Sequence, residues 1–450
     1  MATTSFDPAT MASQLATAYT QNAQTLITTQ TSQAQATSTA LSKLQSVLSS
    51  FNTSLIALSA SKSVLARTAA FDTTTYGTAS ASATAQPGSY SFFVERLATT
   101  HQVAYESLPA AGGGTLKVDL AGGGSFTVDL SSADQDSDGQ LSATETALAI
   151  NSASGNASQV SASVVTSGGV SKLVLTAGKS GADTQISLDT SNVTGALQTA
   201  LSGGGNVLKT GQDAIVWMGD QGTGVRLEQA SNTFTAVAGV TINFTKAMTT
   251  GDTPVTLTVS GDDSGTAANV QKFIDAYNTL RTTLDDLTKN ANGDAGTSAG
   301  AFASDASVRA LKNRLGEIAR MEVGGLRLAD FGVSIDRSGK LALDQTKLTA
   351  GLAAHPGGLD TVFGSTSITA PSGVFGAFDS YLELWTNSSS GQIKHRQDSV
   401  QITQKSVASR QTRLDDQYNN LYKRYLAQFT QLQTLQESMS QTGSIFDNLS

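Results

Sequence analysis

Twelve residues in the first third of the chain have the spacing of a calcium-binding loop. Residues 134–145 read Asp-Gln-Asp-Ser-Asp-Gly-Gln-Leu-Ser-Ala-Thr-Glu, which matches the complete loop pattern. Calcium takes about six to eight oxygen ligands, supplied here by carboxylates, one backbone carbonyl and a position that often acts through water. We therefore predict Ca²⁺, and no organic cofactor, with these ligands: Asp134, Asp136, Asp138, Gln140 (by its carbonyl), Ser142 and Glu145.

The same residues also have a simpler explanation. Ser142-Ala-Thr-Glu145 is a capping box for a following helix, and the three aspartates could form an ordinary acidic turn. Gly139 and Leu141 stand where the calcium loop requires its sharp turn and its apolar residue. A strand is predicted before the loop and a helix over 144–152 after it. We expect a single loop between strand and helix, and not a paired calcium sensor.

The region around the loop is predicted to be β-rich. It is dominated by Gly, Thr and Ser, with short alternating apolar runs between turn residues. Glycine triplets at 112–114, 122–124 and 203–205 are predicted turns or flexible connections. The predicted strands are 89–94, 125–130, 160–165, 173–176, 186–188, 214–218, 225–227, 240–244 and 255–259.

Both ends of the chain are predicted to be long helices that bury a narrow apolar stripe. Asp7 and Pro8 give a helix start signal, and residues 391–441 form the second long helix. Residues 1–40 have a thin stripe and should order only against a partner. The stripe residues are Leu41, Leu44, Leu48, Phe51 and Leu55 near one end, and Ile393, Val400, Val407, Leu414, Tyr418, Leu421 and Tyr425 near the other.

Composition limits the class of protein. A chain of 450 residues should form two to four domains. The net charge of −8 argues against nucleic acid as a partner. We expect no secretory signal peptide and no membrane insertion, since the first residues form no apolar run. A basic run near the C-terminus is interpreted as solvated helix positions: Lys394, Arg396, Lys405, Arg410 and Arg413.

No constellation of residues indicates an enzyme. Gly178-Lys-Ser180 lacks the first glycine of a phosphate-binding loop, because Leu173 occupies that position. The chain has no cysteine, and its histidines are scattered, so no zinc cluster is predicted. Serine is abundant, but the one Gly-x-Ser-x-Gly spacing, at Gly296-Thr-Ser-Ala-Gly300, does not follow a predicted strand, as a nucleophile elbow would.

Several segments, in this order, resemble the flagellar filament cap family, hook-associated protein 2. The first are 7–15, Gly88-Ser-Tyr-Ser-Phe-Phe-Val94 with Leu97-Ala98, and Gln212-Asp-Ala-Ile-Val216. The others are Ser231-Asn-Thr233 with Gly239-Val-Thr241, 270–280 with Ala276-Tyr277-Asn278, and Phe331-Gly-Val-Ser-Ile-Asp336 with Gly339-Lys-Leu-Ala-Leu343. Each motif alone is weak, but their order between two heptad helices is specific. The calcium loop is inferred from its own residues and not from the resemblance.

The resemblance implies an α+β multidomain protein whose terminal helices pair as a coiled-coil leg. Residues 1–40 and 391–450 would form the leg, 41–80 and 266–390 a mixed helical stem, and 81–265 the inserted antiparallel β-domains. A break near 203–213 would divide the β-domains into two. The implied protein is secreted and sits outside the cell at the flagellar tip, where it promotes flagellin folding and polymerisation and prevents monomer leakage. The implied partners are flagellin, the flagellar type III export machinery, an export chaperone and further copies in a ring-shaped homo-oligomer, for which a pentamer is one candidate size.

Two alternatives remain open. The chain could be a hook–filament junction or filament subunit, although the inserted β-region favours a cap. It could also be a surface adhesin stiffened by calcium, and a tip protein could serve both roles. Deleting the β-region would separate these, because an adhesin loses only attachment whereas a cap also loses filament growth.

Overall fold

The computed structural model describes residues 7–291 and 298–447, with side chains as far as residue 442. The chain divides into two compact units. The helical unit contains residues 1–64 and 266–450, and the β unit contains residues 65–265. Each unit is described by itself below.

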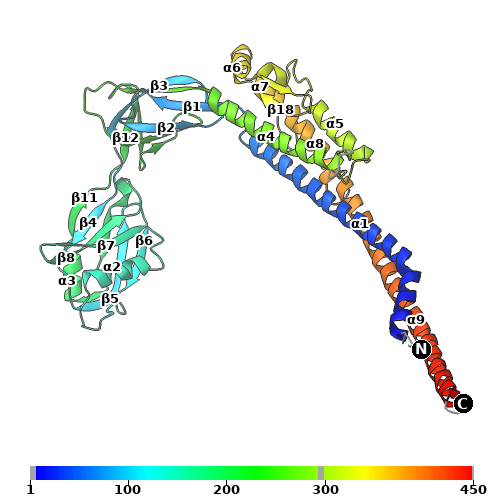
Figure 1. The fold of residues 1–450 in the computed structure, drawn as a ribbon. Helices are drawn as coiled ribbons and strands as arrows, with labels where there is room; N and C mark the ends of the chain where they lie inside the picture. The colour runs from blue at the N-terminus through cyan, green and yellow to red at the C-terminus, as the bar shows by residue number, and fades with distance from the viewer. Residues whose placement is uncertain (1–6, 292–297, 448–450) are drawn as a thin grey trace. The chain divides into compact units, whose positions relative to one another are not determined.

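The helical unit is built on two long helices, α1 (Pro8–Ala60) and α9 (Gln392–Asp447). α1 begins at the predicted start signal. The Asp7 carboxylate accepts hydrogen bonds from the backbone nitrogens of Ala9 (3.2 Å) and Thr10 (3.0 Å), which satisfies donors that a helix start leaves unpaired. Figure 1 shows α1 (blue) beside α9 (orange to red), and contacts between these two helices are extensive.

An aromatic core lies where α1 meets the other helices of this unit. These are α4 (Asp263–Thr288), α5 (Ala306–Ile318), α7 (Gly358–Phe363) and α8 (Gly373–Thr386). The Phe51 ring of α1 lies 5.2 Å from that of Phe378 and 6.2 Å from that of Tyr277. Phe273 packs against both Phe363 (5.2 Å) and Phe375 (5.8 Å). Buried aromatic rings remove large apolar areas from water, so this core stabilises the unit.

A small appendage joins α5 to α8. It contains a hairpin, β17 (Val333–Ile335) paired with β18 (Leu341–Leu343), followed by α6 (Gln345–Ala354). The side chain of Asn278 on α4 holds this hairpin by two hydrogen bonds, one to the Leu341 carbonyl and one from the Leu341 amide, each 2.8 Å. The hairpin is therefore fixed to the core of the unit.

The β unit has two separate hydrophobic cores and so consists of two lobes. Lobe A contains an antiparallel sheet in the order β1-β16-β3-β12-β13 and a smaller sheet in the order β14-β15-β2. Its strands are β1 (Ala66–Phe71), β2 (Gly77–Ala81), β3 (Gly88–Arg96), β12 (Ala214–Met218), β13 (Val225–Gln229), β14 (Thr233–Phe234), β15 (Val240–Phe244) and β16 (Val255–Asp262).

Lobe B contains residues 134–145, the predicted calcium-binding loop, which is called the acidic loop below. Its sheets have the orders β10-β5-β6, with β9 also paired to β5, and β11-β4-β8-β7. The helices α2 (Ala143–Ser152) and α3 (Ala196–Ser202) pack into the same core. Its strands are β4 (Gln102–Tyr105), β5 (Gly112–Leu120), β6 (Ser125–Asp129), β7 (Val160–Ser167), β8 (Val170–Ala177), β9 (Ile186–Asp189), β10 (Val193–Gly195) and β11 (Asn206–Lys209).

The predicted boundary between residues 80 and 81 is wrong. The β unit begins at Leu65, because β1 pairs with β16 (Ala66 opposite Asp262) and β2 pairs with β15 (Gly77 opposite Phe244). The sequences of β1 and β2 are rich in small residues and carry no alternating apolar pattern, so only their distant partners reveal them. The other boundary, between residues 265 and 266, agrees with the structure.

The glycines at 112–114 were predicted to form a turn or a flexible connection, and this is also wrong. They begin β5 and pair with β10, Gly112 opposite Gly195 and Gly114 opposite Val193. A Cβ on Gly112 would lie 2.0 Å from the Thr194 carbonyl oxygen, and Gly114 has a φ of +95°. Glycine is required here because the two strands approach too closely for a side chain. Within the described residues, no helix is both long enough and apolar enough to span a bilayer.

Candidate functional site

The two long helices run antiparallel, and polar side chains fix their register. Gln397 of α9 donates a hydrogen bond to Gln45 of α1 (2.9 Å). Further along α9, the hydroxyl of Tyr418 lies 3.3 Å from the Ser13 hydroxyl, near the start of α1. The residue numbers rise along α9 while those of the partner residues fall along α1. The predicted pairing of the terminal helices is therefore confirmed, and its direction is antiparallel.

The heptad residues of α9 form the seam of this pair as far as Leu421. Ile393, Val407, Leu414 and Leu421 are buried, whereas Val400 is half-buried. The Tyr418 ring is stacked on that of Tyr422 on the next turn, with centroids 6.4 Å apart, and both rings are half-buried. Tyr425 is also half-buried, with the Arg424 guanidinium 5.0 Å from its ring centroid.

The heptad residues of α1 serve two different partners. Leu41, Leu44, Leu48, Phe51 and Leu55 are all buried. α9 begins at Gln392, only five residues before the Gln397 that meets Gln45, so α1 extends beyond α9 towards its own C-terminus. Phe51 packs against α4 and α8. Phe51 and Leu55, two residues of the predicted stripe, therefore lie beyond the pairing with α9, in the part of α1 assigned to the stem. Their spacing does not distinguish the two partners, since any helix with one buried face has it.

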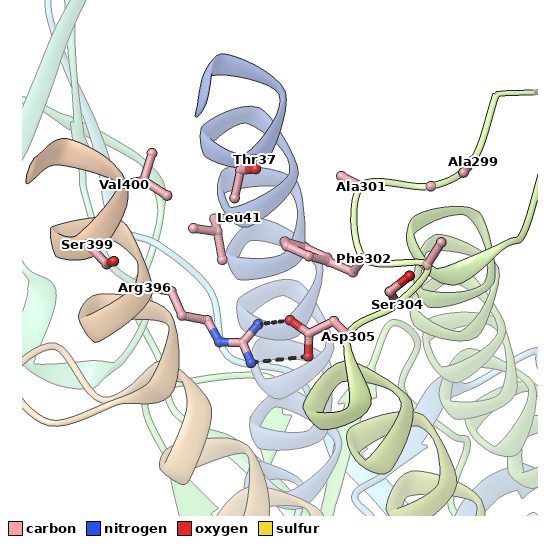
Figure 2. A pocket seen from close by; sticks show the side chains of 12 residues that line it. Thr37, Leu41, Ala299, Ala301, Phe302, Ser304, Asp305, Arg396, Ser399 and Val400 are labelled. Carbon is pink, nitrogen blue, oxygen red and sulfur yellow. Dashed lines mark hydrogen bonds and ion pairs between the residues drawn. The ribbon is translucent and has the colours of Figure 1, made fainter. Parts of the chain in front are cut away.

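An open cavity of about 520 Å³ lies between α1, α9 and the segment before α5. Figure 2 shows Thr37 and Leu41 on α1, Ser399 and Val400 on α9, and Phe302 on the connecting segment. Aliphatic and aromatic groups form much of its wall. At one end of this cavity an ion pair joins α9 to the start of α5.

That ion pair connects three helices. The two terminal nitrogens of Arg396 reach the two carboxylate oxygens of Asp305, at 2.6 and 3.3 Å (Figure 2). The same guanidinium lies 5.5 Å from the ring centroid of Trp385 on α8. Asp305 is also the N-cap of α5, accepting from the backbone nitrogens of Ser307 (2.9 Å) and Val308 (3.1 Å). Arg396 thus fixes the N-terminal end of α9 against α5 and α8.

The sequence interpretation of Arg396 as a solvated position was wrong. Its side chain is only 25% exposed, as is that of Asp305. Burial raises the pKa of the Asp305 carboxyl, but the hydrogen bonds from Arg396 and from the Val308 backbone outweigh that effect and leave the pKa below its usual value. The charge pattern could not reveal this pair, because the partners are 91 residues apart.

The acidic loop precedes α2 in lobe B, as its sequence predicts. Carboxylate oxygens of Asp134, Asp136 and Asp138 lie within 4.8 Å of one another, a spacing at which one cation could contact all three. Two backbone nitrogens, those of Ser137 (2.7 Å) and Gly139 (2.9 Å), donate to Asp134. Gly139 has a φ of +80°, the left-handed conformation that the sharp turn requires.

The far end of the loop turns its last carboxylate back towards the first residues. One Glu145 oxygen accepts from the Gln135 backbone nitrogen (2.8 Å), and the other accepts from the Ser142 nitrogen (2.9 Å) and hydroxyl (2.8 Å). Ser142 in turn caps α2, so the capping box is present together with the carboxylate cluster. Gln140 is exposed, and its neighbour Leu141 is buried, with its backbone bridged to that of Ala110.

The electrostatics of the loop are those of a crowded acidic site. Hydrogen bonds from the Ser142 backbone, the Ser142 hydroxyl and the Gln135 backbone lower the pKa of Glu145 to about 2. The Asp138 backbone also lowers the pKa of Asp136, but partial desolvation and the charges of Asp138 and Glu145 outweigh it and raise that pKa overall. A bound cation would relieve this repulsion between like charges.

Family models match both ends of the chain. Residues 4–101 match the model described as Flagellar hook-associated protein 2 N-terminus, and residues 211–441 match Flagellar hook-associated protein 2 C-terminus. The intervening residues 102–210, which make up most of lobe B, lie outside both matches. The acidic loop is therefore a feature of this chain that neither family model covers.

Related proteins agree with these matches. The lateral flagellar hook-associated protein 2 of Vibrio parahaemolyticus is 35% identical over 82% of this chain and 83% of its own length. The B-type flagellar hook-associated protein 2 of Pseudomonas aeruginosa is 30% identical over 91% of this chain and 89% of its own. The crystal structure of the flagellar cap protein FliD D1-D2-D3 domains from Escherichia coli is 26% identical, with a TM-score of 0.62, and covers 80% of this chain and 99% of that one. The chain therefore belongs to the flagellar hook-associated protein 2 family, a family of flagellar cap proteins.

Proposed function

We propose that this protein is secreted and caps the distal end of the flagellar filament as a ring-shaped homo-oligomer. There it holds arriving flagellin while each subunit folds and joins the filament, and it prevents loss of unassembled flagellin. The observation that carries this proposal is the difference in packing along α1. The N-terminal part of α1 is weakly packed and its C-terminal part is densely packed. This difference suits a helix whose N-terminal part rearranges while its C-terminal part stays fixed in the core.

The weakly packed part of α1 buries few large side chains. Its buried residues as far as position 34 are Ala12, Ala16, Thr20, Ile27 and Ala34. Ile27 of this stretch forms a small hydrophobic cluster across the pair, with Val407 and Leu414 of α9. Burying an alanine removes much less apolar area from water than burying a leucine, so this part gains little stability from packing. Its pairing with α9 can open without unfolding the aromatic core.

A second face of the same helix segment carries exposed apolar side chains. Met11, Leu15, Tyr19 and Leu26 are between 40% and 64% exposed, and their spacing places them on one side of α1. An exposed apolar stripe on a helix favours contact with another protein. We assign this stripe to flagellin, since the segment that can rearrange is the one that must adjust as each flagellin subunit arrives.

Export through the flagellar type III route, with an export chaperone, is part of the same proposal. A chain that passes through a narrow channel must be unfolded, and disulfides would oppose this. The sequence contains no cysteine. The thin packing of the leg also lowers the free energy needed to unfold it before export.

The test is removal of residues 1–39 from the full chain, expressed in cells that lack the intact protein. The truncated protein should keep its aromatic core and remain soluble, but flagellar filaments should not grow. Export is measured separately, by assaying the truncated protein in the culture medium. A truncated protein that is exported and still supports normal filaments would contradict the proposal.

We also propose that the acidic loop binds calcium outside the cell. The matching sequence spacing supports this, together with the convergence of Asp134, Asp136 and Asp138 and the inward turn of Glu145. Loops of this kind in extracellular modules have dissociation constants of about 10⁻⁴–10⁻³ M. Cytosolic calcium is far lower, so the loop would fill only after export. Calcium at about 1 mM would then stabilise lobe B by about 0.4–1.4 kcal/mol.

The calcium proposal is tested by thermal unfolding of the purified protein. The unfolding temperature should be higher in millimolar calcium than in chelator, and magnesium at the same concentration should have a smaller effect, because it prefers a tighter octahedral site. Equal unfolding temperatures in calcium and chelator would rule the site out.

A further inference from the structure

One edge of the four-stranded sheet in lobe B is closed partly by side chains instead of by a further strand. β7 stands at the end of the order β11-β4-β8-β7, so it has a strand neighbour on one side only. In antiparallel pairs, every second residue of an edge strand directs its backbone N–H and C=O away from that neighbour. These outward groups form a template on which a strand of another chain can pair.

Two asparagine side chains occupy the beginning of this template. The Asn151 amide, from the last turn of α2, donates to the Ala162 carbonyl (2.7 Å), and its oxygen accepts from the Ala162 N–H (2.9 Å). The Asn156 amide makes the same two bonds with Val160 (2.8 and 2.9 Å). Each carboxamide therefore takes the place that a peptide group of a neighbouring strand would take.

The exposure of the two asparagines separates their roles. Asn156 is 4% exposed, so it is a buried part of the fold. Asn151 is exposed, so solvent, and hence another chain, can approach the edge at Ala162. Among the described residues, no side chain is hydrogen-bonded to the backbone of Val164 or Thr166, the next two outward residues of the edge.

The opposite edge of the sheet is protected in a different way. β11 is only four residues long, its pairing with β4 shifts register between Val207 and Lys209, and Lys209 places a charge on it. Short length, irregular pairing and lysine all discourage the addition of a further strand. β7 has eight residues, regular pairing with β8 and no charged residue. The β7 edge therefore depends on the asparagines for its protection.

We propose that Asn151 closes the β7 edge and thereby prevents lobe B from pairing with lobe B of a second copy of this chain. With Asn151 in place, the open edge contains Val164 and Thr166 only. Loss of Asn151 opens Ala162 as well, and the three outward residues are then symmetric about Val164. Two copies can pair antiparallel in this arrangement, with Ala162 of each opposite Thr166 of the other. The inference concerns residues that neither family model covers, and it does not rest on the proposed cap function.

Two substitutions of Asn151 in the full-length protein separate closure of the edge from support of the fold. Asn151→Ala removes both hydrogen bonds and leaves the edge open, whereas Asn151→Lys removes the same bonds but places a charge at the edge. Light scattering over a concentration series measures the association constant between copies. It should rise about tenfold for Asn151→Ala, the factor expected for one or two further hydrogen bonds between chains. It should stay at the value of the intact protein for Asn151→Lys.

A second change and a matched control make this comparison specific. Adding Thr166→Lys to Asn151→Ala places a charge on the open edge and should return the association constant to that of the intact protein. The control is Gln198→Ala on α3, because the Gln198 amide also donates to a backbone carbonyl of lobe B, that of Thr190 (3.1 Å), but away from β7. This control should leave association unchanged. Circular dichroism checks that all the variants are equally folded.

Hydrogen exchange locates the contact. The amides of Val164 and Thr166 should exchange more slowly in associated Asn151→Ala than in the intact protein, because pairing covers them. Equal association of Asn151→Ala and Asn151→Lys would overturn the inference. Increased association of Gln198→Ala, or unchanged exchange at Val164 and Thr166, would overturn it as well.

Discussion

Gln24 and Gln411 exchange two hydrogen bonds across the pair of long helices. The Gln24 amide nitrogen donates to the Gln411 oxygen (3.0 Å), and the Gln411 nitrogen donates to the Gln24 oxygen (2.9 Å). Such a reciprocal pair forms in only one alignment of the two helices. In a segment whose buried side chains are mostly small, polar pairs of this kind set the register that apolar packing leaves weakly specified.

The first prediction concerns this amide pair. Gln24→Ala, Gln411→Ala and the double variant should show a coupling free energy of about 0.5 kcal/mol, because each single change already removes both hydrogen bonds. Urea unfolding followed by helical circular dichroism measures it. The control is Gln401→Ala on the exposed side of α9, which should add independently to either change. Simple additivity of Gln24→Ala and Gln411→Ala would show that the pair does not set the register.

The second prediction concerns the N-terminal end of α9. Arg396→Lys keeps the positive charge but loses the bidentate ion pair with Asp305 and the stacking on Trp385. This substitution should therefore destabilise the helical unit by about 1–2 kcal/mol. Asp305→Ala should cost more, because it also removes the cap of α5. The matched control is Arg314→Lys, since Arg314 pairs with Glu317 at an exposed position where ion pairs contribute little. Denaturant unfolding of all three variants provides the comparison.

The third prediction separates calcium binding from helix capping in the acidic loop. Glu145→Gln keeps an oxygen that can accept from the Ser142 backbone but loses the two-oxygen charged ligand. It should therefore abolish the calcium-dependent rise in unfolding temperature, and it should also lower the value in chelator, because the Gln135 backbone nitrogen loses its acceptor. Ser142→Ala removes the cap of α2 and should cost about 1 kcal/mol in chelator. If Glu145→Gln still responds to calcium, Glu145 is not a ligand.

The fourth prediction concerns pH. His101 is buried, and its Nδ1 accepts a hydrogen bond from the Ile186 backbone nitrogen (3.1 Å). Burial lowers the pKa of His101 below its usual 6.5, so the unfolded chain takes up this proton first as the pH falls. The stability that His101 contributes is present above pH 6.5 and decreases as the pH falls through the lower pKa of the folded protein.

His101→Asn provides the comparison for that prediction, because its side-chain oxygen can occupy the place of Nδ1 and does not titrate. Unfolding temperatures are measured between pH 8 and pH 5. The intact protein should lose stability over the acidic part of this range by more than the variant does. Parallel curves for the two proteins would show that His101 makes no contribution to the pH dependence.

Local patterns predicted the elements whose signals are local. The start of α1 at Asp7 and Pro8 follows from capping chemistry, and β12 and β15 follow from short apolar runs bounded by turns. α8 was not predicted, because its glycines interrupt a helical pattern and its burial depends on Phe51 and Phe273 from distant helices. Intrinsic helix propensity depends on residue type and cannot predict contacts with distant helices.

In the candidate site, too, features with local sequence signals were predicted and features that depend on distant residues were not. The ligand spacing in the acidic loop is local, and the structure brings three of the predicted carboxylates together. The Arg396 pair depends on a partner 91 residues away, so the sequence showed only a basic run. The heptads predicted buried stripes correctly, but they could not indicate that Phe51 faces α4 and α8 rather than α9.

The uninterrupted course of α1 has a mechanical consequence. Its 53 residues form a rod about 80 Å long, with proline only at its first position and no glycine. Sharp kinks in helices arise at prolines, glycines and inserted groups, so a rod of this kind bends little. A push or twist applied near Leu15 is therefore carried to Phe51 and to the aromatic rings around it. α1 therefore acts as a lever arm that transmits forces from its weakly packed N-terminal part to the aromatic core of the helical unit.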